Sequence, residues 1–265
     1  MPQLLVSVRN AVEAIAATEG GADIIDIKEP IRGSLGCAAP HVIREIADTL
    51  HKAQFPFRPL SEALGEMTEW GTVESASSCE SAHGSSIPRD VAGQQQAELE
   101  LRVAVAHAAA QFLKLGFANV VSSRHASSWI SEWNRLRASM RGQHAWVAVG
   151  YADHDRAGAP NVNAVLHAAV QTGCSVLLID THTKDGSSLL SWLTVDQLSE
   201  LRRQTLLHGL KLALAGRVTS GDLPQLLTIN SDIIAVRGAV CDRGNRTAAV
   251  SKDLVKQFRA AMDDG

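Results

Sequence analysis

Charged side chains end three short apolar runs of this sequence. Asp26 and Lys28 close one run two residues apart, so both point to the same face of a strand. Lys114 lies inside a second run, Asp180 ends a third, and Lys184 follows in the next loop. A partly desolvated lysine beside another cation is a neutral amine near pH 7 and attacks a carbonyl to form a Schiff base. A second lysine or a carboxylate then moves protons, so these residues predict a metal-independent, aldolase-type site.

The structural alternative for the same residues is a network of ion pairs. Burying charges is costly unless they are paired, and Lys28 with Asp26 and Lys114 with Asp180 are the pairs to expect. Three strands that each end in a charge favour a catalytic role instead, because strand ends at the top of a parallel barrel converge on one mouth.

Eight apolar runs alternate with helix-like segments. The runs are apolar on both faces, as the strands of a buried parallel sheet are. The predicted strands are residues 4–8, 24–28, 57–63, 112–116, 145–150, 176–180, 211–215 and 233–237. The predicted helices are 12–19, 40–53, 97–110, 127–140, 163–172, 194–208, 221–228 and 251–262. Thr194 and Gln197 have the spacing of a capping box.

Eight strand–helix units in 265 residues favour the α/β class and a single (β/α)8 TIM-barrel domain over residues 1–265. A doubly wound sheet is the alternative, but the turn after Val8 lacks the glycine-rich sequence that such a sheet requires. The segment 65–96, rich in Ser, Glu and Gly, interrupts the alternation after the third strand. We interpret it as a solvated, partly mobile insertion loop, with a lid over the site as the alternative.

Two glycine–arginine pairs follow the last two predicted strands, where this fold often binds phosphate. The pairs are Gly216 with Arg217, and Arg237 with Gly238. Arg243 and Arg246 are weaker additions to the same site.

Asp153, His154 and Asp155 follow the fifth predicted strand. We interpret them as a polar loop rather than a metal site, because no second histidine stands at ligand spacing. Asp153 is still placed to serve the site from the end of its strand.

Composition excludes several classes of protein. With 25 Lys and Arg against 28 Asp and Glu, the net charge of −3 argues against nucleic-acid binding. No apolar run reaches the roughly 18–20 residues of a membrane span, and the N-terminus lacks the features of a signal peptide. The four cysteines have no CxxC spacing. We expect a cytoplasmic protein.

Nine motifs spread over residues 4–244 together resemble the (5-formylfuran-3-yl)methyl phosphate synthase family, also called 4-(hydroxymethyl)-2-furancarboxaldehyde-phosphate synthase. The motifs are LLVS (4–7), GGADIIDIKEP (20–30), RGSLG (32–36), FLKLG (112–116), VGYAD (149–153), LIDT (178–181), KDG (184–186), LALAG (212–216) and VRGAVCDRG (236–244).

The resemblance implies a TIM barrel that condenses two glyceraldehyde 3-phosphate molecules, with loss of phosphate and water, to a furan phosphate for methanofuran biosynthesis. It implies that Lys28 forms the Schiff base, that Lys114 transfers protons, and that Asp26, Asp180 and Lys184 line the same site. We expect the triose phosphate to be the partner, with no metal and no cofactor, and the chain to form a homo-oligomer.

The third strand departs from the family pattern. Archaeal members read SATVGD where this chain reads SEALGE at 61–66, so the final acid is kept as Glu66 and Glu62 is an additional acid. The insertion at 65–96 is also longer than in archaeal relatives. These differences concern the geometry of the lid and the range of substrates rather than the two lysines.

Overall fold

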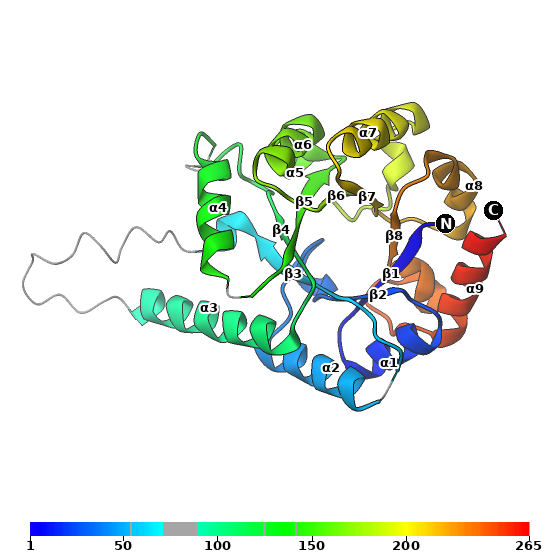
Figure 1. Ribbon diagram of the computed structural model, residues 1–265, viewed down its shortest axis with the longest axis horizontal. Helices are drawn as coiled ribbons and strands as arrows, with labels where there is room; N and C mark the ends of the chain where they lie inside the picture. Colours follow the sequence, from blue (N-terminus) through cyan, green and yellow to red (C-terminus); the bar gives the residue numbers. More distant parts are fainter. Residues whose placement is uncertain (54, 71–88, 124–125, 141, 265) are drawn as a thin grey trace, which may run out of the picture.

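Eight parallel strands form a closed barrel in the computed structural model, which describes residues 1–53, 55–70, 89–123, 126–140 and 142–264. Each strand pairs with the next, and the last pairs with the first (Figure 1). The strands are β1 (Gln3–Val8), β2 (Ile24–Ile27), β3 (Leu60–Glu66), β4 (Phe112–Gly116), β5 (Ala145–Tyr151), β6 (Val176–Asp180), β7 (Lys211–Leu214) and β8 (Ile233–Val236). The predicted (β/α)8 fold is therefore confirmed.

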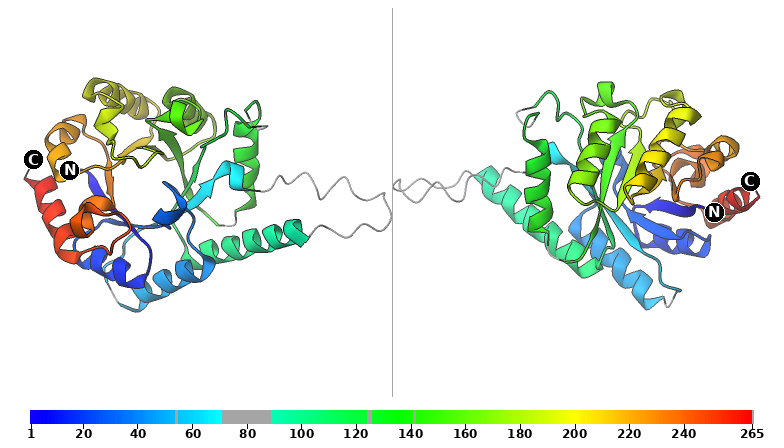
Figure 2. Two further views of the ribbon diagram at one scale, coloured as in Figure 1. Left: turned by 180° about the vertical axis from the view of Figure 1, so that it is seen from behind. Right: turned by 45° about the horizontal axis from the view of Figure 1, so that its top comes forward.

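Helices follow the strands and surround the barrel, as the two further views show (Figure 2). They are α1 (Ala11–Glu19), α2 (Pro40–Lys52), α3 (Arg89–Ala108), α4 (Trp129–Ser139), α5 (His154–Ala157), α6 (Val162–Gln171), α7 (Val195–Leu207), α8 (Leu223–Leu226) and α9 (Lys252–Asp263). The predicted capping box is confirmed at α7, where Thr194 accepts from the Gln197 amide and the Gln197 side chain accepts from the Thr194 amide. Within the described residues, no helix is long and apolar enough to cross a membrane.

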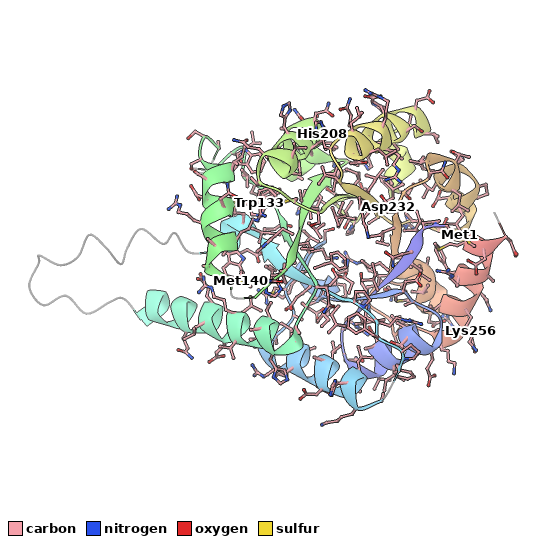
Figure 3. The ribbon with its side chains drawn as sticks, in the orientation of Figure 1. Met1, Trp133, Met140, His208, Asp232 and Lys256 are labelled. Atoms are coloured by element: carbon pink, nitrogen blue, oxygen red, sulfur yellow. The ribbon has the colours of Figure 1, made fainter. Side chains whose placement is uncertain are left out.

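Two apolar layers hold the barrel together. One fills its interior, with Ile24, Val149 and Leu178 among its members. The other lies between strands and helices, where Trp133 of α4 packs edge-on against the Phe117 ring at 5.0 Å between centroids (Figure 3). Burying apolar area in both layers provides the main driving force for this fold. Because these layers are apolar, the polar side chains of the barrel interior lie near the ends of the strands.

The third strand and the helix after it differ from the sequence prediction. β3 begins at Leu60 rather than at residue 57, because Pro56 and Pro59 lack the N–H groups that a ladder needs. α3 begins at Arg89, so residues 89–96 of the expected insertion loop are helical. This stretch is rich in good helix formers but has no apolar periodicity to reveal it.

The start of the expected insertion also differs from the prediction. Its first two residues complete β3, and Met67–Glu69 form a 3-10 turn. Residues 71–88 lie outside the described residues, and with them most of the segment interpreted as a mobile loop or a lid. The predicted helix at 221–228 is divided, since only Leu223–Leu226 are α-helical, with a 3-10 turn on each side.

Candidate active site

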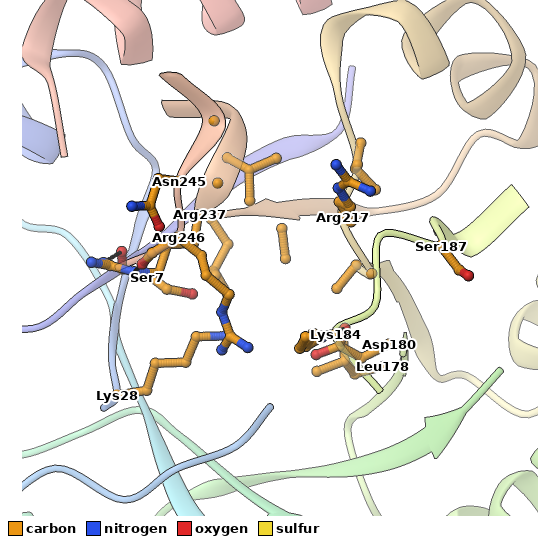
Figure 4. A pocket seen from close by; sticks show the side chains of 18 of the residues that line it. Ser7, Lys28, Leu178, Asp180, Lys184, Ser187, Arg217, Arg237, Asn245 and Arg246 are labelled. Carbon is orange, nitrogen blue, oxygen red and sulfur yellow. Dashed lines mark hydrogen bonds and ion pairs between the residues drawn. The ribbon is translucent and has the colours of Figure 1, made fainter. Parts of the chain in front are cut away.

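The five residues singled out for chemistry meet at one end of the barrel. Asp26 lies near the end of β2, and Lys28 follows that strand. Lys114 comes from β4, Asp180 ends β6, and Lys184 lies in the following loop. Four of them line a single cavity at the mouth, and Figure 4 labels three, Lys28, Asp180 and Lys184. The fourth is Lys114, which forms an ion pair with Asp26. Spacing along the strands therefore predicted which side chains come together.

Lys114 and Asp26 form a buried ion pair across the interior of the barrel. Lys114 Nζ lies 2.6 Å from Asp26 Oδ1, and both side chains are at most 4% exposed. Ser7 donates to the other carboxylate oxygen at 2.8 Å. The ladder explains the arrangement, because Ser7 pairs with Asp26 in adjacent strands and paired residues share a face. A pair buried this deeply is costly to keep, which favours a use beyond stability.

The Lys28 amine has a pKa far below its usual range. Burial lowers its pKa to about 7, against the opposing attraction of Asp26 and Asp180 and with help from the positive charges of Lys114 and Lys184. Its Nζ donates to the Ser34 carbonyl oxygen at 3.2 Å. A large fraction of this amine is therefore neutral near pH 7 and able to act as a nucleophile.

Asp180 stays ionised although it is buried. Burial alone raises the pKa of the Asp180 carboxyl, but Lys184, Lys28 and hydrogen bonds from Ser34 and Thr181 bring it to about 2. Lys184 Nζ lies 3.3 Å from Asp180 Oδ1, and the Ser34 hydroxyl lies 2.8 Å from Oδ2. The site thus holds a fixed negative charge opposite the Lys28 amine.

Ser34 is a site residue that the sequence reading missed. Its hydroxyl bonds Asp180, and its carbonyl accepts from Lys28, so the loop after β2 crosses the mouth to the end of β6. Its only sequence signal is its place between Gly33 and Gly36 in a motif of the family. The contact joins residues 146 positions apart, so no local pattern reveals it.

The arginine that follows β8 is held by the surrounding backbone and by Glu13. Arg237 is 6% exposed, and its guanidinium contacts Glu13 at 2.9 Å. Its N–H groups also donate to the backbone oxygens of Ser7, Arg246 and Ala248. Arg237 borders the cavity, but these partners occupy its donors, so its geometry suits positioning rather than direct contact with a phosphate.

Gly216, Arg217 and Gly238 also border the cavity. A Cβ at Gly216 would lie 3.0 Å from the Thr181 side chain, and its φ is +98°. This close approach requires glycine and leaves backbone bordering the cavity. Arg217 is exposed and donates to the Gly186 carbonyl oxygen. These residues offer an anion one cation, Arg217, and glycine backbone that carries no side chain.

Asp153 stands behind the loop that carries Lys184. It is 2% exposed, and its carboxylate accepts from the backbone amides of His182 and Thr183 at 2.6 and 2.8 Å. It is absent from the residues that line the cavity. Its geometry therefore supports the loop rather than the substrate. Across the described ranges of the chain, no cluster of three or more His, Cys, Asp or Glu side chains is arranged to hold a metal ion.

The two acids of the third strand lie in different environments. Glu66 accepts from the Tyr151 hydroxyl at 2.5 Å and from the Ala118 amide at 2.8 Å. Glu62 is 0% exposed, and neither of its carboxyl oxygens has a hydrogen-bond partner among the described residues. It lies on the face of β3 opposite Ala63, which belongs to the interior layer. Glu62 therefore points towards the helices, away from the cavity.

Glu62→Gln is expected to stabilise the protein at neutral pH. Burial, with the nearby charge of Asp26, raises the pKa of the Glu62 carboxyl well above 4.5. The unfolded chain releases this proton near pH 4.5 and the folded chain keeps it. Stability is therefore lost as pH rises, by about 1.4 kcal/mol per pH unit until the folded pKa is reached. Glutamine cannot ionise, so the gain in unfolding free energy should be small at pH 4.5 and larger at pH 7.

Urea unfolding of both proteins at the two pH values measures this difference. Glu69→Gln, in the 3-10 turn after β3, serves as the matched control substitution. A Glu62→Gln variant that is equally or less stable than the parent at pH 7 would contradict the assignment of a protonated carboxyl.

Fold and site together define a (β/α)8-barrel protein with a neutralisable lysine amine and a cation-rich cavity at the mouth. Residues 4–259 match the family model described as 4-HFC-P synthase. The chain therefore belongs to the 4-HFC-P synthase family.

Relatives of the chain carry a more specific name. It is 34% identical over 257 residues to the (5-formylfuran-3-yl)methyl phosphate synthase of Methanococcus maripaludis strain S2, covering 96% of this chain and 97% of the relative. It is 33% identical to the protein of that name in Methanopyrus kandleri, covering 98% and 99%. The resemblance noted in the sequence is thus confirmed.

Solved structures of other proteins share the barrel. N-(5'-phosphoribosyl)anthranilate isomerase from Pyrococcus furiosus aligns with a TM-score of 0.57 at 11% identity, covering 100% of both chains. 3-Hexulose-6-phosphate synthase from Salmonella typhimurium aligns with a TM-score of 0.55 at 14% identity, covering 99% of both chains. At these identities the similarity establishes the fold alone.

Proposed function

We propose that this chain condenses two molecules of glyceraldehyde 3-phosphate through a Schiff base on Lys28, giving (5-formylfuran-3-yl)methyl phosphate with loss of phosphate and water. The observation that carries the proposal is the Lys28 amine, whose pKa of about 7 and position in the cavity suit attack on an aldehyde. The names of the relatives support the identity of the product and its use in methanofuran biosynthesis.

The first bond formed joins Lys28 Nζ to the aldehyde carbon, and loss of water from the adduct gives an iminium. A carbanion next to a bare carbonyl is costly, whereas the iminium provides a fixed positive charge where negative charge develops. Loss of a proton from the neighbouring carbon then gives an enamine. The enamine electrons attack the second aldehyde. A hydroxyl oxygen then attacks the iminium carbon and displaces the Lys28 amine, which closes the ring, and elimination of phosphate and dehydration complete the furan.

The neighbouring charges are suited to particular roles in these steps. Asp26 and Lys114, 2.6 Å apart, form the pair that moves the proton from the carbon next to the iminium. Asp180 stabilises the iminium as its counter-ion, and Lys184 protonates leaving oxygen atoms. Gly216, Arg217 and Gly238 hold a phosphate, while Arg237 and Asp153 keep the loops around them in place.

Borohydride trapping tests the proposal. The protein is incubated with glyceraldehyde 3-phosphate and sodium borohydride, and the adduct is located by intact mass and peptide mapping. We expect one reduced triose phosphate on Lys28, and near-ultraviolet absorbance from a furan when borohydride is omitted. An adduct without a furan would favour another Schiff-base aldolase acting on sugar phosphates. Absence of both would favour a non-catalytic phosphometabolite-binding protein and would contradict the proposal.

A further inference from the structure

The cavity at the mouth is lined by more cations than the protein neutralises. Six Lys and Arg side chains border it. Three of them form ion pairs with carboxylates, which are Lys114 with Asp26, Lys184 with Asp180 and Arg237 with Glu13. The other three, Lys28, Arg217 and Arg246, have no carboxylate within ion-pair distance in the described part of the chain. Burial lets the Lys28 amine become neutral, so two permanent positive charges remain.

Arg246 is the less expected of these two charges. It lies in the loop after β8, is only partly exposed, and donates one hydrogen bond, to the Gly33 carbonyl oxygen at 2.9 Å. Its other N–H groups make no hydrogen bond to any residue that the structure describes. A guanidinium that borders a cavity and keeps free N–H donors is suited to bind an anion there.

The two arginines lie on different walls of the cavity. Arg217 contacts Gly186, in the loop after β6. Arg246 contacts Gly33, whose neighbour Ser34 accepts the hydrogen bond from Lys28. Figure 4 shows Arg246 and Lys28 on one side of the cavity and Arg217 on the other. The two guanidinium groups therefore approach the cavity from different sides.

We propose that Arg246 forms a second phosphate subsite, on the side of the cavity away from Gly216 and Arg217. The cavity then binds two monophosphorylated trioses, or the six-carbon bisphosphate that joins them, with one phosphate at each arginine. This inference rests on the site and substrate class of the proposed function and adds the residue that recognises the second substrate. Each phosphate neutralises one of the two charges left without a carboxylate.

Equilibrium binding of two hexitol phosphates tests the subsite without any chemistry. Glucitol 1,6-bisphosphate carries a phosphate at each end of a six-carbon chain, and glucitol 6-phosphate carries only one. Neither has a carbonyl group, so neither forms an imine with Lys28. By titration calorimetry we expect the bisphosphate to bind about 10- to 100-fold more tightly than the monophosphate, the effect of one additional charge-assisted contact.

Arg246→Met should remove this difference. The affinity for the bisphosphate should fall to that for the monophosphate, while the affinity for the monophosphate stays within about twofold, which also shows that the variant is folded. Arg246→Lys should keep part of the difference, because it keeps the charge. Arg243→Met is the matched control, because the Arg243 side chain in the same loop is 92% exposed and borders no part of the cavity.

Two results would overturn the second subsite. One is equal affinity of the parent protein for both hexitols, and the other is an equal loss of affinity for both in Arg246→Met, which would place Arg246 in a single anion site. These measurements are independent of turnover. A protein that fails borohydride trapping but distinguishes the two hexitols would contradict the proposed function and leave the second subsite standing.

Discussion

Replacing Lys28 by alanine is expected to lower the rate of furan formation by about 10⁴-fold or more, the loss typical of removing a covalent nucleophile. The reason is that no other amine in the mouth has a comparable environment. Lys114 Nζ lies 2.6 Å from Asp26 and Lys184 Nζ lies 3.3 Å from Asp180, whereas Lys28 forms no ion pair with a described residue. The rate of appearance of furan absorbance from glyceraldehyde 3-phosphate measures the loss, and borohydride should no longer trap an adduct.

The fold should survive this substitution. The Lys28 side chain makes one hydrogen bond to the described residues, to the Ser34 carbonyl oxygen, and the protein gains by no longer burying the amine. Lys256→Ala, on the exposed face of α9, is the matched control and should keep full activity. A folded Lys28→Ala protein that retains more than about 1% of the parent rate would rule out Lys28 as the nucleophile.

The sequence was sufficient to predict how the strands are arranged but not how the charges pair. Period-two alternation placed Asp26 and Lys28 on one face, and strand ends brought Lys114 and Asp180 to the same mouth. The pairs expected for a purely structural network were Lys28 with Asp26 and Lys114 with Asp180, and these are wrong. Lys114 of β4 reaches through the interior to Asp26 of β2, with β3 between the two strands. Lys184, a loop residue, pairs with Asp180.

The remaining differences come from contacts between distant parts of the chain. Ser34 joins Lys28 and Asp180 through a loop whose path the sequence does not specify. Glu62 sits in an apolar layer although a carboxyl group favours water, because the strand that carries it alternates between two buried faces. Arg237 has the glycine neighbour typical of a phosphate site, but its guanidinium forms an ion pair with Glu13 of α1. Each outcome depends on tertiary neighbours rather than on local pattern.

Lys114→Met is expected to move the pH dependence of the reaction to higher pH. At present the Lys28 amine gains its nucleophilic form as pH rises through about 7, so kcat/KM should rise over that range and then level. Lys114 lowers the Lys28 pKa and Asp26 raises it. In the variant, the repulsion of Lys114 no longer offsets the attraction of Asp26, so the Lys28 pKa increases. The rise in kcat/KM should therefore occur at least about one pH unit higher. Loss of a proton-transfer group should also lower the plateau by about 10²- to 10⁴-fold.

Stability should fall in the same variant. Removing Lys114 leaves the Asp26 carboxylate buried with the Ser7 hydroxyl as its one side-chain partner among the described residues, which costs about 3–5 kcal/mol of unfolding free energy. Urea unfolding at pH 8 measures this cost. Assays at temperatures well below the midpoint of unfolding keep it separate from the kinetic effect.

The double variant Asp26→Asn/Lys114→Met separates electrostatics from proton transfer. It removes both charges, and the attraction of Asp26 has a larger effect on the Lys28 pKa than the repulsion of Lys114. The rise in kcat/KM should therefore return to the parent pH or slightly below it, while the plateau stays low. Two results would show that the Asp26–Lys114 pair does not set the pKa of the Lys28 amine. One is a Lys114→Met protein whose kcat/KM still rises near pH 7, and the other is a double variant whose kcat/KM still rises at the higher pH.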